Sequence, residues 1–455
     1  GGGAGRLRRR TGAREIETRV VTPTSFRRLL WAIDLGELPE GVEAAAPGTE
    51  DLLSHDLRAE ARSVALLDSI LVDAVESRAS DVHLEHQRRD ARARIRVDGE
   101  LRELVHLGLG KRALSTVVRV AKVKAGLDIA ESRAPQGGQF ETRVGGRSFF
   151  VRVQSQPTIH GENLVMRLLP QEPEQRSLAE LGFSADAEER YRRMLFNPGG
   201  LVLVVGPTGS GKTTTLYAGL RLLAEETTRK VISIEDPVEY VCDGVQQVEV
   251  NPEVGFGFGE AMRHFVREDP DVILLGEIRD RETALEAIRA SQTGHLVLSS
   301  LHCNDAVDAI QRLLDLGMHP NSIASELLAV FAQRLARRIC PECRVSLAPD
   351  PVVAAEVYPE GVPEGYEAWR GEGCEACAGS GTRGRIALVE MLRVTPALRR
   401  AVSQSALLDD LRQVAQASGL VALRERALER ARQGTIAFES LPRFLSLERL
   451  RPTAD

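Results

Sequence analysis

The segment from Leu201 to Thr214 constrains the fold of this chain more than any other segment. The apolar run LVLVVG (201–206) is typical of a β-strand that is buried on both faces of a parallel sheet. The sequence GPTGSGKT (206–213) follows at once and matches the pattern G-x-x-x-x-G-K-[ST]. Glycines in such a loop allow backbone N–H groups to surround phosphate oxygens at the N-terminus of a helix. The sequence therefore predicts a strand, a phosphate-binding loop and a helix in succession.

Two residues of this loop carry distinct chemistry. The Lys212 ammonium can reach the β- and γ-phosphates of a nucleotide, and the Thr213 hydroxyl can ligate Mg²⁺. The residues expected to contact the nucleotide are Gly206, Pro207, Thr208, Gly209, Ser210, Gly211, Lys212, Thr213 and Thr214.

Strands and helices alternate after the loop, which favours a parallel α/β sheet. The further strands are expected at 231–236, 271–277 and 295–300. The helices are expected near 281–292, 305–316 and 321–338, and the stretch 384–447 is mostly helical in its pattern. Before the loop, a helix near 59–77 and hairpins at Asp98-Gly99 and Gly145-Gly146 predict a small α+β domain.

These patterns divide the chain into six parts. They are a truncated N-terminal domain with its linker (1–58), an α+β domain (59–170), a linker (171–182), the P-loop domain (183–339), a tetracysteine module (340–383) and a helical C-terminal region (384–455). Within the first part, SFRRLLWAIDL (25–35) is predicted to be an amphipathic helix.

Composition excludes several classes of protein. The net charge is −6, which disfavours a protein whose main task is to coat nucleic acid. No stretch approaches the roughly 18 apolar residues of a membrane span, and the start GGGAGRLRRR lacks the apolar core of a signal peptide. Six cysteines in 455 residues are too few for a disulfide scaffold.

Three carboxylates are expected to act on the phosphates. Glu277 ends the apolar strand DVILLGE (271–277), where it can hold Mg²⁺ or the water bound to it. Glu235 and Glu239 lie in EDPVE, at the end of the preceding strand, and one of them can orient or deprotonate the attacking water. Glu235 is the first choice for that role, and a solvated acidic loop is the alternative.

Two histidines bracket the next apolar strand. His295 and His302 can each sense a γ-phosphate through a hydrogen bond, although an isolated histidine is more often a core or surface residue. Neither shows the spacing to cysteines or carboxylates that a metal site needs.

Four cysteines form two C-x-x-C pairs. Cys340, Cys343, Cys374 and Cys377 can present four thiolates to one ion, which is the closed set typical of structural Zn²⁺. The proline-rich segment between the pairs is expected to be a loop that folds around the metal. A redox function is the alternative.

Together these motifs resemble those of the bacterial ATPases of type II secretion and type IV pilus assembly, the GspE/PilB family. The resemblance rests on ASDVHLE (79–85), GPTGSGKTTT (206–215), IEDPVEY (234–240), REDPDVILLGEIRD (267–280), TGHLVLSSLHCNDA (293–306) and the tetracysteine module. It covers the chain from about 60 to 440 and favours the secretion branch, because the N-terminal extension is short.

The resemblance implies a RecA-like P-loop domain behind a small PAS-like α+β domain, with ATP, Mg²⁺ and Zn²⁺ as ligands. It implies a cytoplasmic homohexamer, peripheral at the inner membrane, which docks on the cytoplasmic domains of inner-membrane platform proteins. ATP hydrolysis would drive pseudopilus assembly and protein export. The alternatives are pilus assembly and, with less support, a DNA-uptake motor. No direct contact with nucleic acid is expected.

The family also uses arginines at its nucleotide site. Arg152 and Arg167 on the α+β domain, and Arg263 and Arg267 before Asp271, match those positions. An arginine that contacts the γ-phosphate can neutralise charge in the transition state. The sequence leaves open whether they act within one subunit or across an interface, and surface charge is the alternative reading of all four.

Overall fold

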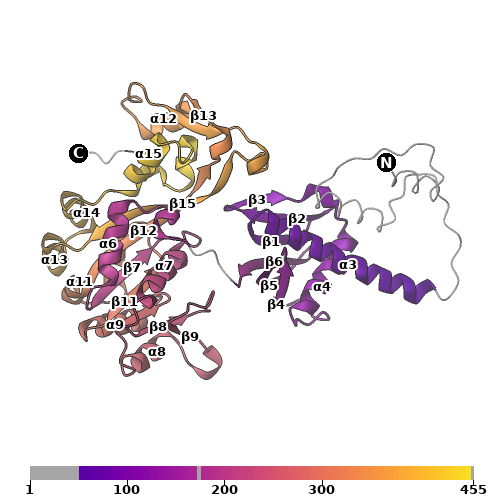
Figure 1. The fold of residues 1–455 in the computed structure, drawn as a ribbon, viewed down its shortest axis with the longest axis horizontal. Helices are drawn as coiled ribbons and strands as arrows, with labels where there is room; N and C mark the ends of the chain where they lie inside the picture. Colours follow the sequence, from indigo (N-terminus) through magenta and orange to yellow (C-terminus); the bar gives the residue numbers. More distant parts are fainter. Residues whose placement is uncertain (1–50, 172–175, 452–455) are drawn as a thin grey trace. The chain divides into compact units, whose positions relative to one another are not determined.

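A computed structural model describes residues 51–171 and 176–451 of the chain. The chain divides into two compact units, with the boundary between Leu168 and Leu169 (Figure 1). The helix predicted at 25–35 lies outside the described residues.

The first unit is one antiparallel sheet with two long helices. Its elements are α3 (Asp51–Glu76), β1 (Ala79–His86), β2 (Ala91–Val97), β3 (Glu100–Glu103), α4 (Lys111–Lys124), β4 (Gln136–Val144), β5 (Arg147–Thr158) and β6 (Gly161–Pro170). The strand order is β3-β2-β1-β6-β5-β4. The hairpins predicted at Asp98-Gly99 and Gly145-Gly146 are confirmed, and all four residues have positive φ angles. The PAS-like description of this unit stays a prediction.

Alternation along the strands explains why both helices lie on one face of this sheet. In β1, Val82 and Leu84 are buried, and they pack with α3 and with the apolar face of α4. Asp81 and His83, which alternate with them along the strand, point to the opposite face. No helix of this unit covers that face, within the described residues.

The second unit contains the phosphate-binding loop in a seven-stranded sheet of order β15-β12-β7-β11-β10-β8-β9. Its first elements are α5 (Leu178–Leu181), α6 (Ala185–Leu195), β7 (Gly200–Val205), α7 (Lys212–Ala224), β8 (Val231–Glu235), β9 (Val245–Glu249), α8 (Phe258–Phe265), β10 (Val272–Leu275), α9 (Arg281–Gln292) and β11 (Leu296–Leu301). The remaining elements are α10 (Asp308–Asp315), α11 (Pro320–Glu326), β12 (Leu327–Ile339), β13 (Arg344–Leu347), α12 (Pro351–Val357), β14 (Ala368–Gly371), β15 (Thr382–Arg393), α13 (Pro396–Ser403), α14 (Leu408–Ala417), α15 (Leu423–Arg432) and α16 (Leu447–Leu450).

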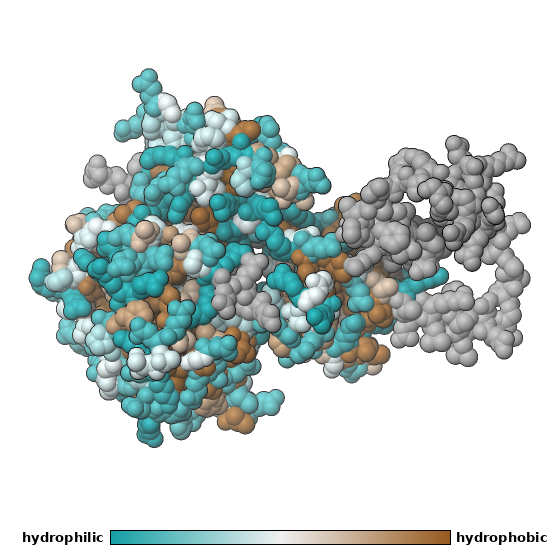
Figure 2. All heavy atoms as spheres, in the orientation of Figure 1, coloured by the Kyte–Doolittle hydropathy of each residue, from teal (hydrophilic) through white to brown (hydrophobic). Residues whose placement is uncertain are grey.

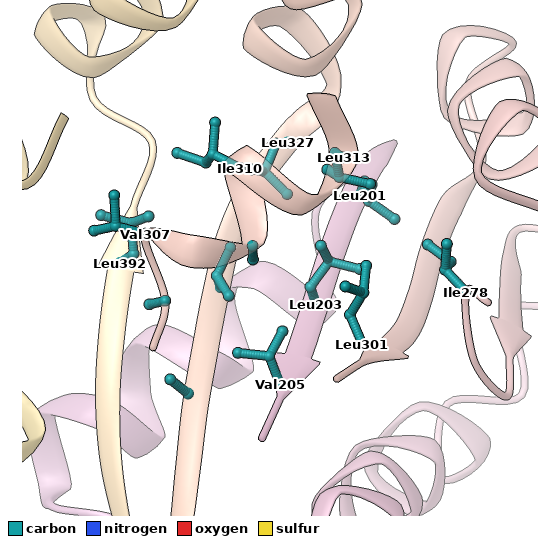
Figure 3. Packing of buried hydrophobic residues seen from close by; sticks show 14 of the residues in the cluster. Leu201, Leu203, Val205, Ile278, Leu301, Val307, Ile310, Leu313, Leu327 and Leu392 are labelled. Carbon is teal, nitrogen blue, oxygen red and sulfur yellow. The ribbon is translucent and has the colours of Figure 1, made fainter. Parts of the chain in front are cut away.

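Both faces of this sheet are buried, as the uninterrupted apolar runs predicted. Val202 and Val204 of β7 pack against α6 and α7. Leu201 and Leu203 point the other way, into the core formed with α8 to α11 and the C-terminal helices (Figure 3). The sheet is therefore the central layer of a three-layer unit, and its central strands are shielded from water.

The predicted helix at 321–338 is wrong beyond its first turns. Helix α11 ends at Glu326, and residues 327–339 form β12, which pairs with β7 in parallel and with β15 in antiparallel register. The sequence LLAVFAQRLARRI is rich in helix-forming Leu, Ala and Arg, so its local propensity favours a helix. Pairing with β7 and β15 stabilises the strand conformation instead. For the same reason 382–393 forms a strand, and the helices of the C-terminal region begin at Pro396.

The predicted linker at 171–182 contains a short helix. Ser177 and Glu180 form a reciprocal capping box at the start of α5, which explains an ordered turn here.

Hydrophilic residues cover much of the visible surface of the molecule, with apolar residues scattered among them (Figure 2). Among the described residues, no helix is both long enough and apolar enough to cross a bilayer.

Candidate active site and metal centre

The phosphate-binding loop follows β7 and is shaped by its glycines. Gly206, Gly209 and Gly211 have φ angles of 152°, 76° and 88°, a region that disfavours side chains. A Cβ on Gly211 would also lie 2.7 Å from Nε2 of Gln333. The loop therefore needs glycine at this position for both backbone conformation and space.

Gln333 of β12 ties this loop to the sheet. Its side-chain amide donates to the Ser210 carbonyl at 2.9 Å and accepts from the Thr215 hydroxyl at 2.8 Å. The side chain is 2% exposed, so both hydrogen bonds are shielded from water. Gln333 thus joins the loop to the first turn of α7.

Lys212 lies across the loop. Its Nζ donates to the carbonyls of Gly206 (3.0 Å) and Pro207 (3.2 Å). Burial lowers the pKa of Lys212, and the nearby Glu277 carboxylate opposes that shift. An anion that displaced these two carbonyl contacts would meet a half-buried ammonium.

Glu277 lies at the same edge of the sheet, within a cluster of charged side chains. The Oε2 atom of Glu277 is 3.4 Å from Nε2 of His302, and its Oε1 accepts from Arg279. Arg279 also donates to Asp236 at 3.2 Å. The ends of β8, β10 and β11 meet here because the strands are parallel. The structure thus brings Glu277 and His302 together, as their predicted roles require.

Glu235 is more enclosed than its predicted role as the residue that positions water suggested. It is 4% exposed and accepts hydrogen bonds from the Ser233 hydroxyl (2.7 Å), the Gln247 amide (3.1 Å) and the Tyr217 hydroxyl. Burial and the carboxylate both raise the pKa of Tyr217, which keeps its hydroxyl protonated and able to donate. The exposed Glu239 lies four residues further along.

His295 is not part of this cluster. It precedes β11, and its Nδ1 lies 2.9 Å from the Ala290 carbonyl at the end of α9. His302 follows the same six-residue strand, and such a strand is about 20 Å long. The two histidines therefore lie at opposite ends of β11. Of the two, only His302 lies at the end of the strand that is near the phosphate-binding loop.

Arg263 and Arg267 lie on α8 and just after its end. Arg263 on α8 pairs with Glu282 of α9 at 2.6 Å, and Arg267 is exposed after the end of that helix. Their predicted contact with phosphate stays a prediction. Arg279, which sequence reasoning missed, is the arginine that contacts Glu277.

The other two predicted arginines share one hollow on the first unit. Arg152 of β5 and Arg167 of β6 line a cavity of about 430 Å³ on the sheet face that lacks helices. Arg167 donates through Nε to Asp81 of β1 at 3.0 Å. Both guanidinium groups thus lie on one face, as a shared role would require.

The four cysteines form a compact cluster. Their sulfur atoms all lie within 4.8 Å of one another, and Cys340–Cys374, Cys343–Cys377 and Cys374–Cys377 are separated by 3.8, 3.9 and 3.8 Å. Four sulfurs at about 2.3 Å from a tetrahedral Zn²⁺ would be about 3.8 Å apart. The cluster therefore has the dimensions of a zinc site.

Backbone groups favour the thiolate form of Cys377 within this cluster. The N–H groups of Cys374 and Gly381 donate to the Cys377 sulfur at 3.1 and 3.2 Å. The Cys374 N–H is the main reason that the pKa of Cys377 falls to about 6.

The segment between the two cysteine pairs is not a loop alone, although the sequence predicted a loop. It contains β13, α12 and β14, and it buries Ala354 and Val357 in the main core.

The sequence profile of the Type II/IV secretion system proteins matches residues 56–443, which is most of the chain. The chain belongs to this family. The "Type II secretion system ATPase E" of Vibrio cholerae serotype O1 is 41% identical over 397 residues, covering 87% of this chain and 78% of the relative. The "Type IV pilus assembly ATPase PilB" of Thermus thermophilus is 39% identical over 84% of this chain, which spans 43% of PilB.

Two solved structures share the fold. The pilus retraction motor PilT with bound ADP superposes with a TM-score of 0.57 at 25% identity, covering 83% of this chain and 96% of PilT. The Legionella pneumophila ATPase DotB has a TM-score of 0.62 at 19% identity, covering 84% of this chain and 96% of DotB. This secretion-family protein is accordingly an ATPase.

Three residues of the site were missed in the sequence. Arg279 had a signal, because it lies two residues after Glu277 at the end of a buried strand. Gln333 had none, because its role depends on β12 being a strand. Tyr217 had none either, because its partner Glu235 is on another element.

Proposed function

We propose that this ATPase is the motor of a type II secretion system, where ATP hydrolysis drives pseudopilus assembly and protein export. The observation that carries the catalytic part is the cluster of Glu277, His302, Arg279 and Asp236 beside the phosphate-binding loop. The assignment to secretion is supported by the identity to ATPase E and by its coverage of that relative.

The loop residues would bind the nucleotide and orient its phosphates. Backbone N–H groups from Gly209 to Thr213 would surround the β-phosphate, and Lys212 would exchange its two carbonyl contacts for phosphate oxygens. Thr213 and Glu277 are the residues suited to hold Mg²⁺, which supplies positive charge to the phosphoryl oxygens when bound. Catalysis here is mainly positioning and electrostatic stabilisation.

His302 and Arg279 fix the carboxylate of Glu277 from two sides. His302 is exposed enough to contact the γ-phosphate from the neighbouring strand. Glu235, held by three donors, would orient the loop EDPVE rather than take a proton. The exposed Glu239 is the proposed residue of that loop for positioning the attacking water.

We further propose a homohexamer, with the hollow that contains Arg152 and Arg167 supplying cations to a nucleotide. Arg263, which pairs with Glu282, and the exposed Arg267 are the second proposed source of cations for the nucleotide, within one subunit or across an interface. His295, at the far edge of the sheet, has no proposed part in hydrolysis. The four cysteines would hold one structural Zn²⁺, since four thiolates leave no position open for water.

We propose that the protein works in the cytoplasm at the inner membrane, where it docks on cytoplasmic domains of platform proteins. The six parts defined from the sequence remain the proposed domain division, with 384–393 serving as a strand of the ATPase sheet. A pilus-assembly role is the second candidate, because PilB matches at nearly the same identity.

Phosphate release from the purified full chain tests this proposal. Turnover should require Mg²⁺ and rise when a platform fragment of a type II system, but not of a pilus system, is added. Stimulation by duplex DNA alone would favour the DNA-uptake alternative. Absence of any ATP-dependent phosphate release from zinc-loaded protein would refute the proposed activity.

A further inference from the structure

Asp81 and Arg167 form an ion pair of unequal exposure on the first unit. The two residues lie opposite one another on β1 and β6, and Nε of Arg167 donates to Oδ1 of Asp81 at 3.0 Å. The Asp81 side chain is 9% exposed, whereas the Arg167 side chain is 61% exposed. Asp81 is therefore the buried member of the pair, and Arg167 is the exposed member that faces the hollow shared with Arg152.

The inner end is held on both carboxylate oxygens. Oδ2 of Asp81 accepts from the Ser80 hydroxyl at 2.7 Å and lies 3.9 Å from Nε of Arg96, which leaves Oδ1 to Arg167. Burial raises the pKa of Asp81, but the Ser80 hydrogen bond and Arg167 outweigh this effect and the pKa is lower than usual. Asp81 is consequently charged at neutral pH.

A hydrogen bond donated by Nε orients a guanidinium and leaves its terminal nitrogens unoccupied. Arg presents five N–H donors in a rigid planar fork, and Nε lies on the stem side of that fork. Among residues 51–171 and 176–451, the hydrogen bond that the structure shows for the Arg167 side chain is the one from Nε. The terminal nitrogens therefore keep their donors for an anion in the hollow.

We propose that Asp81 is a positioning residue for ATP hydrolysis, which directs the terminal nitrogens of Arg167 toward the phosphates of a nucleotide. This inference rests on the proposed function of Arg167. The exposure of Arg167 argues against a mainly structural role for the pair, because ion pairs with a solvated partner add little to stability.

The sheet offers a matched control. Glu85, four residues after Asp81 on β1, pairs with Arg94 of β2 through two hydrogen bonds of 2.8 and 2.6 Å. Neither residue lines the hollow. Glu85→Gln therefore breaks an ion pair of the same sheet without touching Arg152 or Arg167.

The test compares steady-state ATP hydrolysis by the full chain and by its variants. Asp81→Asn is expected to lower kcat by at least about tenfold with KM for ATP nearly unchanged, because a misplaced catalytic group costs turnover. Glu85→Gln is expected to keep wild-type kcat. Asp81→Asn combined with Arg167→Ala should be no slower than Arg167→Ala alone, since Asp81 acts through Arg167.

Two results would overturn the inference. One is wild-type kcat in Asp81→Asn. The other is a double variant that is slower than Arg167→Ala by the full factor of Asp81→Asn. If the Tm of Asp81→Asn is lower than that of Glu85→Gln, the variant Ser80→Ala is used in place of Asp81→Asn. Ser80→Ala removes the donor to Oδ2 of Asp81 and should still lower kcat. An unchanged kcat in Ser80→Ala also refutes the inference. Wild-type kcat in Arg167→Ala would instead refute the proposed role of Arg167 itself.

Discussion

Replacing Gln333 by Met removes both hydrogen bonds that join the phosphate-binding loop to β12, with little change in side-chain volume. The Ser210 carbonyl then loses the donor at 2.9 Å, and the Thr215 hydroxyl loses its acceptor at 2.8 Å. Both contacts are buried, so water cannot replace Gln333 without opening the structure.

The cost follows from the two groups that are left unsatisfied. A buried polar group without a partner costs about 1–3 kcal/mol. The Thr215 hydroxyl can turn to the Gly211 carbonyl one helical turn earlier, so its share is at the low end. We expect the free energy of unfolding to fall by about 2–4 kcal/mol in total. A unit of this size loses about 2 °C of Tm per kcal/mol, so Tm should fall by about 4–8 °C.

Nucleotide affinity should fall as well, because a loosened loop must be ordered again when phosphate binds. If that ordering requires about 1.4 kcal/mol, Kd rises about tenfold. Calorimetric titration with ADP and a thermal melt check the two effects on one sample. Gln311→Met is the control, since Gln311 bonds Asp315 at the surface of α10. Tm and Kd that match those of Gln311→Met would refute the reasoning.

Three further predictions concern catalysis, metal and assembly. Glu277→Gln should bind ATP with wild-type affinity but lose at least about 10² in kcat, and normal phosphate release by this variant would remove Glu277 from the mechanism. Freshly purified, reduced protein should contain one Zn²⁺ per chain by elemental analysis, and Cys374→Ser should lower both zinc content and Tm; metal-free protein that melts like the wild type contradicts a structural site. Specific activity should rise with protein concentration as hexamers form, so constant activity in a monomeric sample across a dilution series would argue against the hexamer.

The sequence predicted those parts of the site that depend on neighbours along the chain. The strand, the glycine-rich loop and Lys212 are contiguous, and Glu277 ends an apolar run whose burial could be read from composition. The tetracysteine cluster was predictable because each C-x-x-C pair is local. What joins these pieces is not local: Gln333 reaches the loop from a segment 118 residues beyond Thr215.

The wrong helix has a simple physical cause, and the histidines show a limit of a different kind. Segment 327–339 contains strong helix formers, and its strand conformation is decided by its two neighbours in the sheet. Of the two histidines expected to sense a γ-phosphate, the structure places His302 and not His295 beside Glu277, because the six residues of β11 separate them. Residues at the two ends of one strand cannot meet at the same edge of a sheet.

The tetracysteine module leaves the sheet from two adjacent antiparallel strands. It begins after Ile339 at the end of β12 and returns at Thr382 at the start of β15, and these two residues are register partners. The module is thus, in topology, the tip of a very long hairpin. Strand ends that are about 5 Å apart can be joined by a turn of two residues or by a whole subdomain, and the ladder beneath keeps the same pairing. The junction of β12 and β15 is therefore an insertion site in the ATPase sheet. Evolution or protein engineering can shorten, exchange or enlarge the inserted module there, and the order of the strands stays the same.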